Sequence, residues 1–203
     1  ETNRTMNRVL AMWREIGAES LNLPNLLTLV RILLIPVFII LFVNPTPDQS
    51  LAAAIVFTVA AVTDMLDGYI ARRTGQVTKL GKLLDPIADK LLVLSALILL
   101  MNVDRVSALV ALLIIGREVA VTGIRAIAAS EGMIIAAETT GKYKMALQVV
   151  AIILLILEGT GLSALGNMHL AGTVTLYLSL VLGYLSGAQY VWSFWKQVVA
   201  KGL

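Results

Sequence analysis

Six apolar stretches, separated by short polar breaks that contain proline, glycine or asparagine, run along almost the whole chain. Each is close to the ~20 residues that an α-helix needs to cross the hydrocarbon core of a bilayer. The breaks, such as 44–48 and 102–104, are too short to hold a further domain. We therefore predict an all-α integral membrane fold with six transmembrane helices, over residues 26–43, 51–72, 82–101, 106–129, 139–157 and 170–194.

Composition supports this fold class, because 58% of the 203 residues are hydrophobic and only 14% are charged. The chain contains no cysteine, which excludes a disulfide framework and a thiolate metal site. We expect residues 22–203 to form one membrane domain. Residues 1–21 mix charged and apolar side chains, which predicts an amphipathic helix along the membrane surface. We assign no function to residues 1–5, which can derive from expression rather than from the native chain.

Lysine and arginine residues gather on alternate connections between the predicted spans. Short cytoplasmic loops carry an excess of these residues, so both termini are predicted to face the cytoplasm, with a bacterial plasma membrane as the expected location. The net charge of +3 reflects this asymmetry and gives no support to nucleic-acid binding. Arg105 is the one basic residue on the opposite connections, whereas the basic side holds Arg72, Arg73, Lys79, Lys142, Lys144, Lys196 and Lys201.

Four aspartates interrupt the apolar sequence around the turn between the second and third spans. Asp64 and Asp67 are three residues apart and Asp85 and Asp89 are four apart, so each pair lies on one face of its helix. Unpaired carboxylates this close repel one another, and some would take up protons. Mg²⁺ or Mn²⁺ removes that penalty, because these hard cations prefer oxygen ligands. Since charges within a bilayer usually serve a function, we predict a divalent-metal site.

Other residues of the same turn suit the binding of a phosphate. Arg72 supplies a positive fork for an anionic group, and Thr78 stands where a hydroxyl caps the next helix or contacts a phosphate. Gly68 and Gly81 allow a phosphate or a neighbouring helix to approach the backbone closely. Helix packing is an equal alternative for the two glycines, as simple capping is for Thr78.

The pattern D-x2-D-G-x2-A-R-x8-G-x3-D-x3-D, from Asp64 to Asp89, resembles the signature of the CDP-alcohol phosphotransferases. The resemblance implies six membrane helices, commonly a homodimer, and transfer of a substituted phosphate from a CDP-linked donor to an alcohol with release of CMP. It also implies that the four aspartates hold two Mg²⁺ or Mn²⁺ ions and that Asp89 is the general base. Contacts to the donor would come from Gly68, Arg72, Thr78 and Gly81.

The acceptor is expected to bind elsewhere, because the fourth span places Arg117 near its middle, where an unpaired guanidinium is costly. Its neighbour Glu118 points about 100° away around the helix, so we expect it to be a poor partner. A phosphorylated acceptor would supply the missing anion. Loop anchoring is an alternative for the lysines of this set, and Arg31 can instead pair with an acid or reach the interface. The residues expected to bind the phosphate are Arg117, Arg125, Lys142, Lys144 and Arg31.

Residues 22–36, 116–125 and 141–145 resemble the branch of this family that uses CDP-diacylglycerol as donor and sn-glycerol 3-phosphate as acceptor. Met145 departs from the threonine that is usual in that branch. In residues 22–36, Asn25 and Thr28 could contact the nucleotide of the donor. The alternative is a structural role for both residues, with Asn25 as a helix cap and Thr28 as a packing hydroxyl.

The expected reaction is therefore transfer of a phosphatidyl group from CDP-diacylglycerol to glycerol 3-phosphate within a lipid membrane. One alternative keeps this chemistry with an inositol phosphate or phosphatidylglycerol as acceptor, the latter as in cardiolipin synthesis. A divalent-cation transporter is the alternative from a different class, but it should carry polar groups through both halves of the membrane. Residues 51–63 and 91–101 are almost wholly apolar, and His169 is expected to be a solvated residue on the far side.

Overall fold

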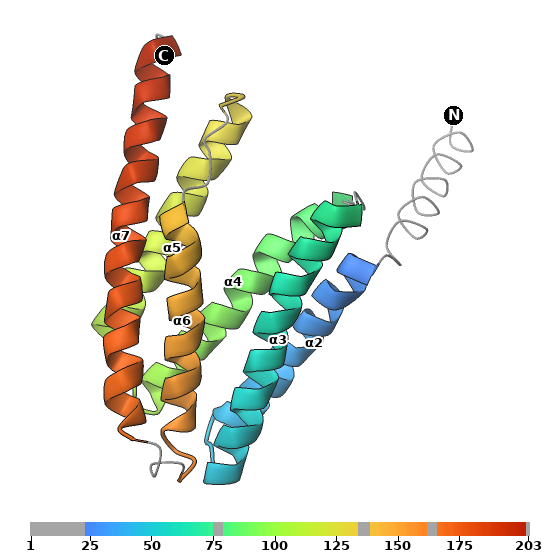
Figure 1. The fold of residues 1–203 in the computed structure, drawn as a ribbon, viewed down its shortest axis with the longest axis vertical. Helices are drawn as coiled ribbons and strands as arrows, with labels where there is room; N and C mark the ends of the chain where they lie inside the picture. The colour runs from blue at the N-terminus through green and yellow to red at the C-terminus, as the bar shows by residue number, and fades with distance from the viewer. Residues whose placement is uncertain (1–22, 75–78, 134–138, 162–165, 202–203) are drawn as a thin grey trace, which may run out of the picture. The chain divides into compact units, whose positions relative to one another are not determined.

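The structure is a computed structural model that describes residues 23–74, 79–133, 139–161 and 166–201. Within these ranges it contains six α-helices and no β-strand (Figure 1). Each predicted apolar stretch overlaps one helix, so the all-α fold class is confirmed for the described residues, and the crossing of a membrane by all six helices stays a prediction. The predicted surface helix of residues 1–21 lies outside the described residues. The helices are α2 (Leu23–Phe42), α3 (Pro47–Thr74), α4 (Lys79–Asn102), α5 (Ala108–Ser130), α6 (Thr139–Leu157) and α7 (Met168–Lys201).

The longest helices extend beyond their predicted ends. α7 has 34 residues and continues seven residues past 194. The apolar run ends near Trp195, Lys196 and Gln197, but none of these residues breaks a helix. At 1.5 Å per residue, a helix of this length is longer than the roughly 30 Å core of a bilayer. We therefore expect one end of α7 to project into the aqueous layer.

Within the described residues, α2, α3, α6 and α7 are long and apolar enough to cross a membrane. In these stretches only 28% to 33% of the residues are buried, so the others keep some surface that lipid can contact. The other two helices fall short because each carries three charged residues in its apolar part. These residues are Asp85, Asp89 and Lys90 in α4, and Arg117, Glu118 and Arg125 in α5.

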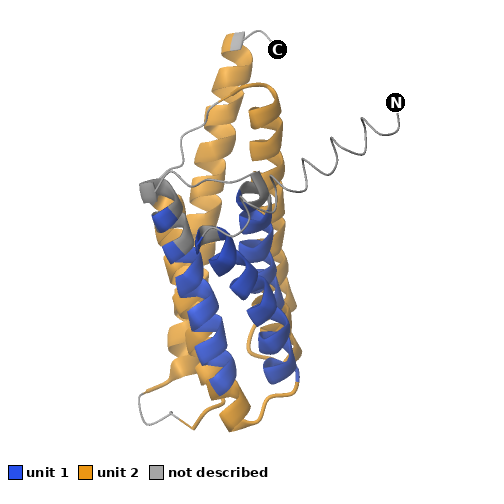
Figure 2. Ribbon diagram, turned by 90° about the vertical axis from the view of Figure 1, so that its right-hand side faces the viewer, with its two compact units in different colours: residues 1–43, 52–95 blue, residues 44–51, 96–203 orange. Residues whose placement is uncertain are grey.

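The chain divides into two compact units, which are coloured separately in Figure 2. The first comprises residues 1–43 and 52–95, and its described part is built from α2, most of α3 and the first part of α4. Its aromatic core joins Phe38 of α2 to Phe57 of α3, with ring centroids 5.6 Å apart. Small buried residues such as Ala53 and Ala60 bring the α3 backbone close to this core.

The second unit comprises residues 44–51 and 96–203, and its main helices are α5, α6 and α7. α7 packs along α6 and also contacts α5. Ile152 and Leu155 of α6 and Leu176 of α7 are almost completely buried between these helices. Gly172 allows the close approach, because a Cβ atom there would lie only 2.7 Å from Leu155 Cγ.

Candidate active site

A buried arginine joins the three helices of the first unit. The Arg31 side chain of α2 has no exposed surface, and its Nη1 atom lies 2.7 Å from Asp64 Oδ1 of α3. The same nitrogen lies 3.7 Å from Asp85 Oδ1 of α4. Buried charges are stable only when they are paired, so this guanidinium and the two carboxylates depend on one another. The structure thus brings two of the four predicted metal ligands to one point.

Thr28 strengthens the same cluster from one turn earlier on α2. Its hydroxyl donates a hydrogen bond of 2.7 Å to Asp85 Oδ1. Asn25, Thr28 and Arg31 follow one another at intervals of three residues, and all three are buried, so they form one polar face of α2. Thr28, for which nucleotide contact and packing were the alternatives, and Arg31, which was expected to bind the acceptor or pair with an acid, both contact carboxylates of the acidic motif.

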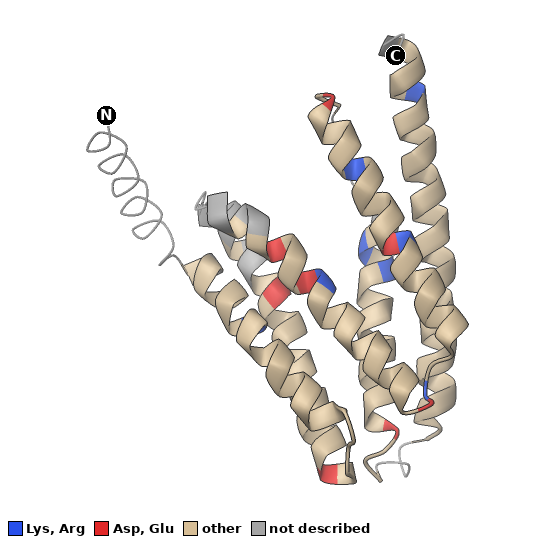
Figure 3. Ribbon diagram, turned by 180° about the vertical axis from the view of Figure 1, so that it is seen from behind, with Lys and Arg blue, Asp and Glu red and all other residues tan. Residues whose placement is uncertain are grey.

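The oxygen-rich chemistry of this cluster suits a divalent cation. Asp64 and Asp85 converge from different helices, and Asp89 lies one turn further along α4 with a partly exposed side chain. Carboxylate oxygens are the ligands that Mg²⁺ and Mn²⁺ prefer. Acidic residues on α3 and α4 can be followed in Figure 3. Among the residues that the structure describes, no group of three or more acidic or histidine side chains could hold a metal ion, and the Asp67 side chain is not among them.

A second polar cluster lies within the other unit, where α5, α6 and α7 meet. Arg117 of α5 donates from Nε to the carbonyl oxygen of Gly183 at 2.8 Å and from Nη2 to Ser186 Oγ at 2.5 Å. Its Nη1 donates to Glu118 Oε1 at 2.9 Å. Lys144 of α6 donates to the same Glu118 oxygen. Glu118 therefore holds two of the predicted phosphate-binding cations together.

The expectation that Glu118 is a poor partner for Arg117 was wrong. The two side chains leave the helix in different directions, as expected from their positions. Both chains are long, so their tips can bend around the helix surface and meet. Contacts with α7 and Lys144 favour this arrangement, because each end of the pair gains a further hydrogen bond.

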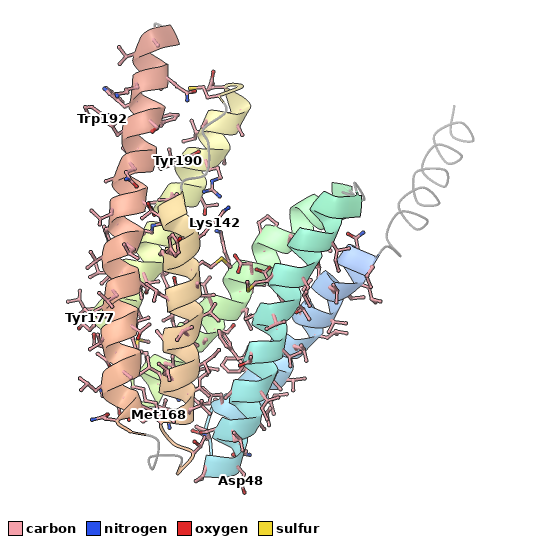
Figure 4. The ribbon with its side chains drawn as sticks, viewed as in Figure 1. Asp48, Lys142, Met168, Tyr177, Tyr190 and Trp192 are labelled. Atoms are coloured by element: carbon pink, nitrogen blue, oxygen red, sulfur yellow. The ribbon has the colours of Figure 1, made fainter. Side chains whose placement is uncertain are left out.

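The other basic residues of the predicted acceptor site lie differently. Arg125 is exposed, and its guanidinium lies 5.5 Å from the ring centroid of Tyr190, a cation–π contact with α7. Lys142 is exposed at the start of α6, and both Lys142 and Tyr190 are labelled in Figure 4. The structure thus joins Arg117 to Lys144 through Glu118 and leaves Arg125 and Lys142 as exposed cations of the same unit.

Comparison with known proteins shows the family of the chain. Residues 21–185 match the family model described as CDP-alcohol phosphatidyltransferase. The chain belongs to this family. The match includes the whole acidic motif from Asp64 to Asp89, so the resemblance found in the sequence is confirmed. As a CDP-alcohol phosphatidyltransferase with apolar helices, the chain is an integral membrane protein and a transferase.

Bacterial relatives extend the similarity over nearly the whole chain. A CDP-diacylglycerol–glycerol-3-phosphate 3-phosphatidyltransferase of Bacillus subtilis is 38% identical over 187 residues, covering 86% of this chain and 96% of the relative. A protein of the same name from Rickettsia bellii is 40% identical over 169 residues, covering 83% of this chain and 93% of the relative. A third, from Yersinia enterocolitica, is 36% identical over 183 residues and covers 88% and 98%, respectively.

Part of the family motif falls where the structure describes no side chains. Asp67, Gly68 and Arg72 belong to α3, but only their helical backbone is described, and Thr78 lies outside the described residues. Gly81 is described as a partly exposed residue of the first turns of α4. The roles expected for these residues in a CDP-alcohol phosphatidyltransferase therefore stay predictions.

The sequence analysis missed the residues of α7 that contact Arg117. Ser186 is 69 residues away along the chain, and no spacing rule connects it to α5. The available signal was the run Gly183, Ser186 and Gly187, which puts small residues on one face of a long helix. His169 is half exposed, as expected, and its Nδ1 lies 2.9 Å from Glu158 Oε2.

Proposed function

We propose that this chain transfers the phosphatidyl group of CDP-diacylglycerol to sn-glycerol 3-phosphate, forming phosphatidylglycerophosphate and CMP. The observation that carries the proposal is the similarity to proteins named for this reaction, which extends over 96% of the Bacillus subtilis relative. The family assignment supports the same reaction class, because a CDP-alcohol phosphatidyltransferase uses a CDP-linked donor.

The acidic cluster supports the chemistry of the transfer. Asp64, Asp67, Asp85 and Asp89 would hold two Mg²⁺ or Mn²⁺ ions, in keeping with the general dependence of the family on divalent metals. Bound ions of this kind neutralise phosphate oxygens and stabilise the departing CMP. Asp89 accepts the proton of the acceptor hydroxyl as that oxygen attacks the phosphorus attached to diacylglycerol. The phosphoanhydride bond to CMP breaks, so no covalent enzyme intermediate is needed.

Donor binding and acceptor binding use different parts of the chain in this proposal. Arg117 and Lys144 bind the phosphate of glycerol 3-phosphate, with Arg125 and Lys142 as accessible cations. Arg31 is better suited to orient Asp64 and Asp85 than to bind the acceptor, because it is already paired with both carboxylates. The contacts to CDP-diacylglycerol come from Asn25, Thr28, Gly68, Arg72, Thr78 and Gly81.

The surroundings of this enzyme follow from the same proposal. All six helices cross the membrane, and the termini and the site face the cytoplasm of a bacterial cell. Charged residues in α4 and α5 then serve binding and catalysis rather than contradicting a membrane span. The protein works as a homodimer among membrane lipids, which also carry its hydrophobic donor.

The apolar stretches of α3 and α4 disfavour a cation transporter. A permeating metal ion needs polar groups along its whole path through the membrane. Residues 51–63 of α3 and 91–101 of α4 contain no charged side chain, so no charged group of these two stretches continues a path from the acidic motif.

The test measures CMP formation by purified protein in detergent with CDP-diacylglycerol and Mn²⁺, with and without glycerol 3-phosphate. We expect release that depends on the acceptor and is lost in Asp89→Asn. Asp48→Asn is the matched control, because Asp48 is an exposed aspartate in the first turn of α3. Release with inositol phosphate or phosphatidylglycerol alone would overturn the acceptor, and Mn²⁺ flux into sealed vesicles without CMP release would overturn the enzyme assignment.

A further inference from the structure

Three hydrogen bonds fix the Arg117 guanidinium between α5 and α7. Their acceptors are the carbonyl oxygen of Gly183, the hydroxyl of Ser186 and the carboxylate of Glu118. A guanidinium has five N–H groups, so within the described part of the chain these bonds leave one N–H on each terminal nitrogen. Charged N–H donors of this kind suit the oxygens of a phosphate.

Ser186 is itself held in one orientation. Its side chain is buried, and its hydroxyl donates to the carbonyl oxygen of Gly183 at 3.1 Å. The hydrogen of a serine hydroxyl can otherwise rotate freely. Because this hydrogen points at Gly183, a lone pair of Ser186 Oγ faces Arg117 Nη2. Gly183, Ser186 and Arg117 therefore form a closed ring of hydrogen bonds that sets the plane of the guanidinium.

The small size of this α7 face does not explain the arrangement. A Cβ atom added at Gly183 would lie 3.7 Å from Arg117 Nε, and one added at Gly187 would lie 3.6 Å from it. Both distances are ordinary van der Waals contacts, so alanine would fit at either position. Hydrogen bonds, rather than a lack of space beside the helix, hold Arg117 in position, and Ser186 supplies the side-chain acceptor that α7 contributes to them.

We propose that Ser186 is a positioning residue for the acceptor, which orients Arg117 so that its two remaining N–H groups meet the phosphate of glycerol 3-phosphate. This inference rests on the proposed function, in which Arg117 binds that phosphate. It gives α7 a part in acceptor recognition, although the sequence indicated no role for this helix in the site.

The variants that test the proposal are Ser186→Ala, Ser186→Thr and Ser186→Val, with Thr175→Val as the matched control. Thr175 lies on the same helix, and its hydroxyl donates to Ala171 O at 2.7 Å. We expect Ser186→Ala to raise the KM for glycerol 3-phosphate about tenfold, because a hydrogen bond to a charged group typically contributes that much. The KM for CDP-diacylglycerol should stay unchanged, and Thr175→Val should match the wild type.

The threonine and valine variants separate hydrogen bonding from packing, because the two side chains have nearly the same shape. Threonine keeps the hydroxyl and should restore the wild-type KM, whereas valine should behave as alanine does. This pair decides the question if the alanine variant does not fold. Equal KM values for glycerol 3-phosphate in the threonine and valine variants, or an equal rise in the KM of both substrates, would overturn the positioning role.

A binding measurement keeps this inference separate from the proposed function. Titration of the purified protein with inorganic phosphate, followed by calorimetry, should show affinity about tenfold weaker in Ser186→Val than in Ser186→Thr. If wild-type protein does not consume glycerol 3-phosphate, the proposed function fails, but this comparison still tests the orientation of Arg117. Equal phosphate affinity of the two variants would reject the positioning role by itself.

Discussion

The Arg31 guanidinium of α2 lies 2.7 Å from the Asp64 carboxylate of α3, with no exposed surface on the arginine. Asp85 of α4 shares the same guanidinium nitrogen at 3.7 Å. The ion pair therefore connects the two halves of the acidic motif, which stand on different helices. It also places a fixed positive charge where carboxylates would otherwise repel one another, so the geometry of this site depends on Arg31 as well as on the aspartates.

Replacing Arg31 should change the dependence on metal more than the affinity for the acceptor. In Arg31→Gln, Asp64 and Asp85 lose their shared cation, and breaking a buried ion pair typically costs about 3–5 kcal/mol. We expect a large loss of kcat, lower thermal stability without metal and greater stabilisation by added Mn²⁺. Arg31→Lys keeps the charge and should retain part of the activity. A selective rise in the KM for glycerol 3-phosphate would instead show that Arg31 binds the acceptor.

Glu118 should act as the resident anion of the predicted acceptor site. It accepts from both Arg117 and Lys144, so Glu118→Gln leaves two cations close together with less compensation. We expect lower thermal stability of the variant, and a larger upward shift of its melting temperature on addition of glycerol 3-phosphate, because a ligand that binds only the folded state stabilises it.

The matched control for this prediction is Glu131→Gln, because Glu131 is an exposed residue at the end of the same helix. Melting curves in detergent with increasing glycerol 3-phosphate provide the measurement. Parallel curves for Glu118→Gln and the wild type would show that the phosphate does not bind near this anion. The cavity that Arg117, Glu118 and Lys144 line has a volume of about 10 Å³, room for one water molecule, so a bound phosphate must separate Glu118 from at least one cation.

The sequence predicted most of the helical fold because apolar length and polar breaks are local features. The range predicted for α6 coincides with the observed helix at 139–157. Of the four aspartates expected to lie together, Asp64 and Asp85 meet at Arg31, and the positions of the other two in the cluster stay predictions. The partners of Arg31 and Thr28, and the α7 partners of Arg117, could not be identified from such local features, because they lie on other helices and depend on how the helices pack.

A steric prediction concerns the contact between α6 and α7. In Gly172→Ala the new Cβ atom would lie 2.7 Å from Leu155 Cγ and 3.2 Å from the Leu155 backbone nitrogen. The backbone cannot yield as a side chain can, so we expect a loss of about 1–3 kcal/mol of stability, as for other overpacked sites. Gly123→Ala is the control, because nothing lies within 4 Å of that position. Unfolding midpoints in mixed detergent should fall for Gly172→Ala only, and equal midpoints would contradict the close packing.

The orientation in the membrane can be tested directly, because the natural sequence has no cysteine and a single introduced thiol is therefore the only one. Asp48 and Ser130 are exposed at the first turn of α3 and the last turn of α5, and the distribution of basic residues puts them on opposite sides. In intact bacterial cells a membrane-impermeant maleimide should label Asp48→Cys at once and Ser130→Cys only after permeabilisation. The reverse order would invert the proposed topology and place the acidic motif outside the cell, where a cytoplasmic CDP-linked donor could not be used. Retained CMP formation in both variants would show that the labelled proteins are folded.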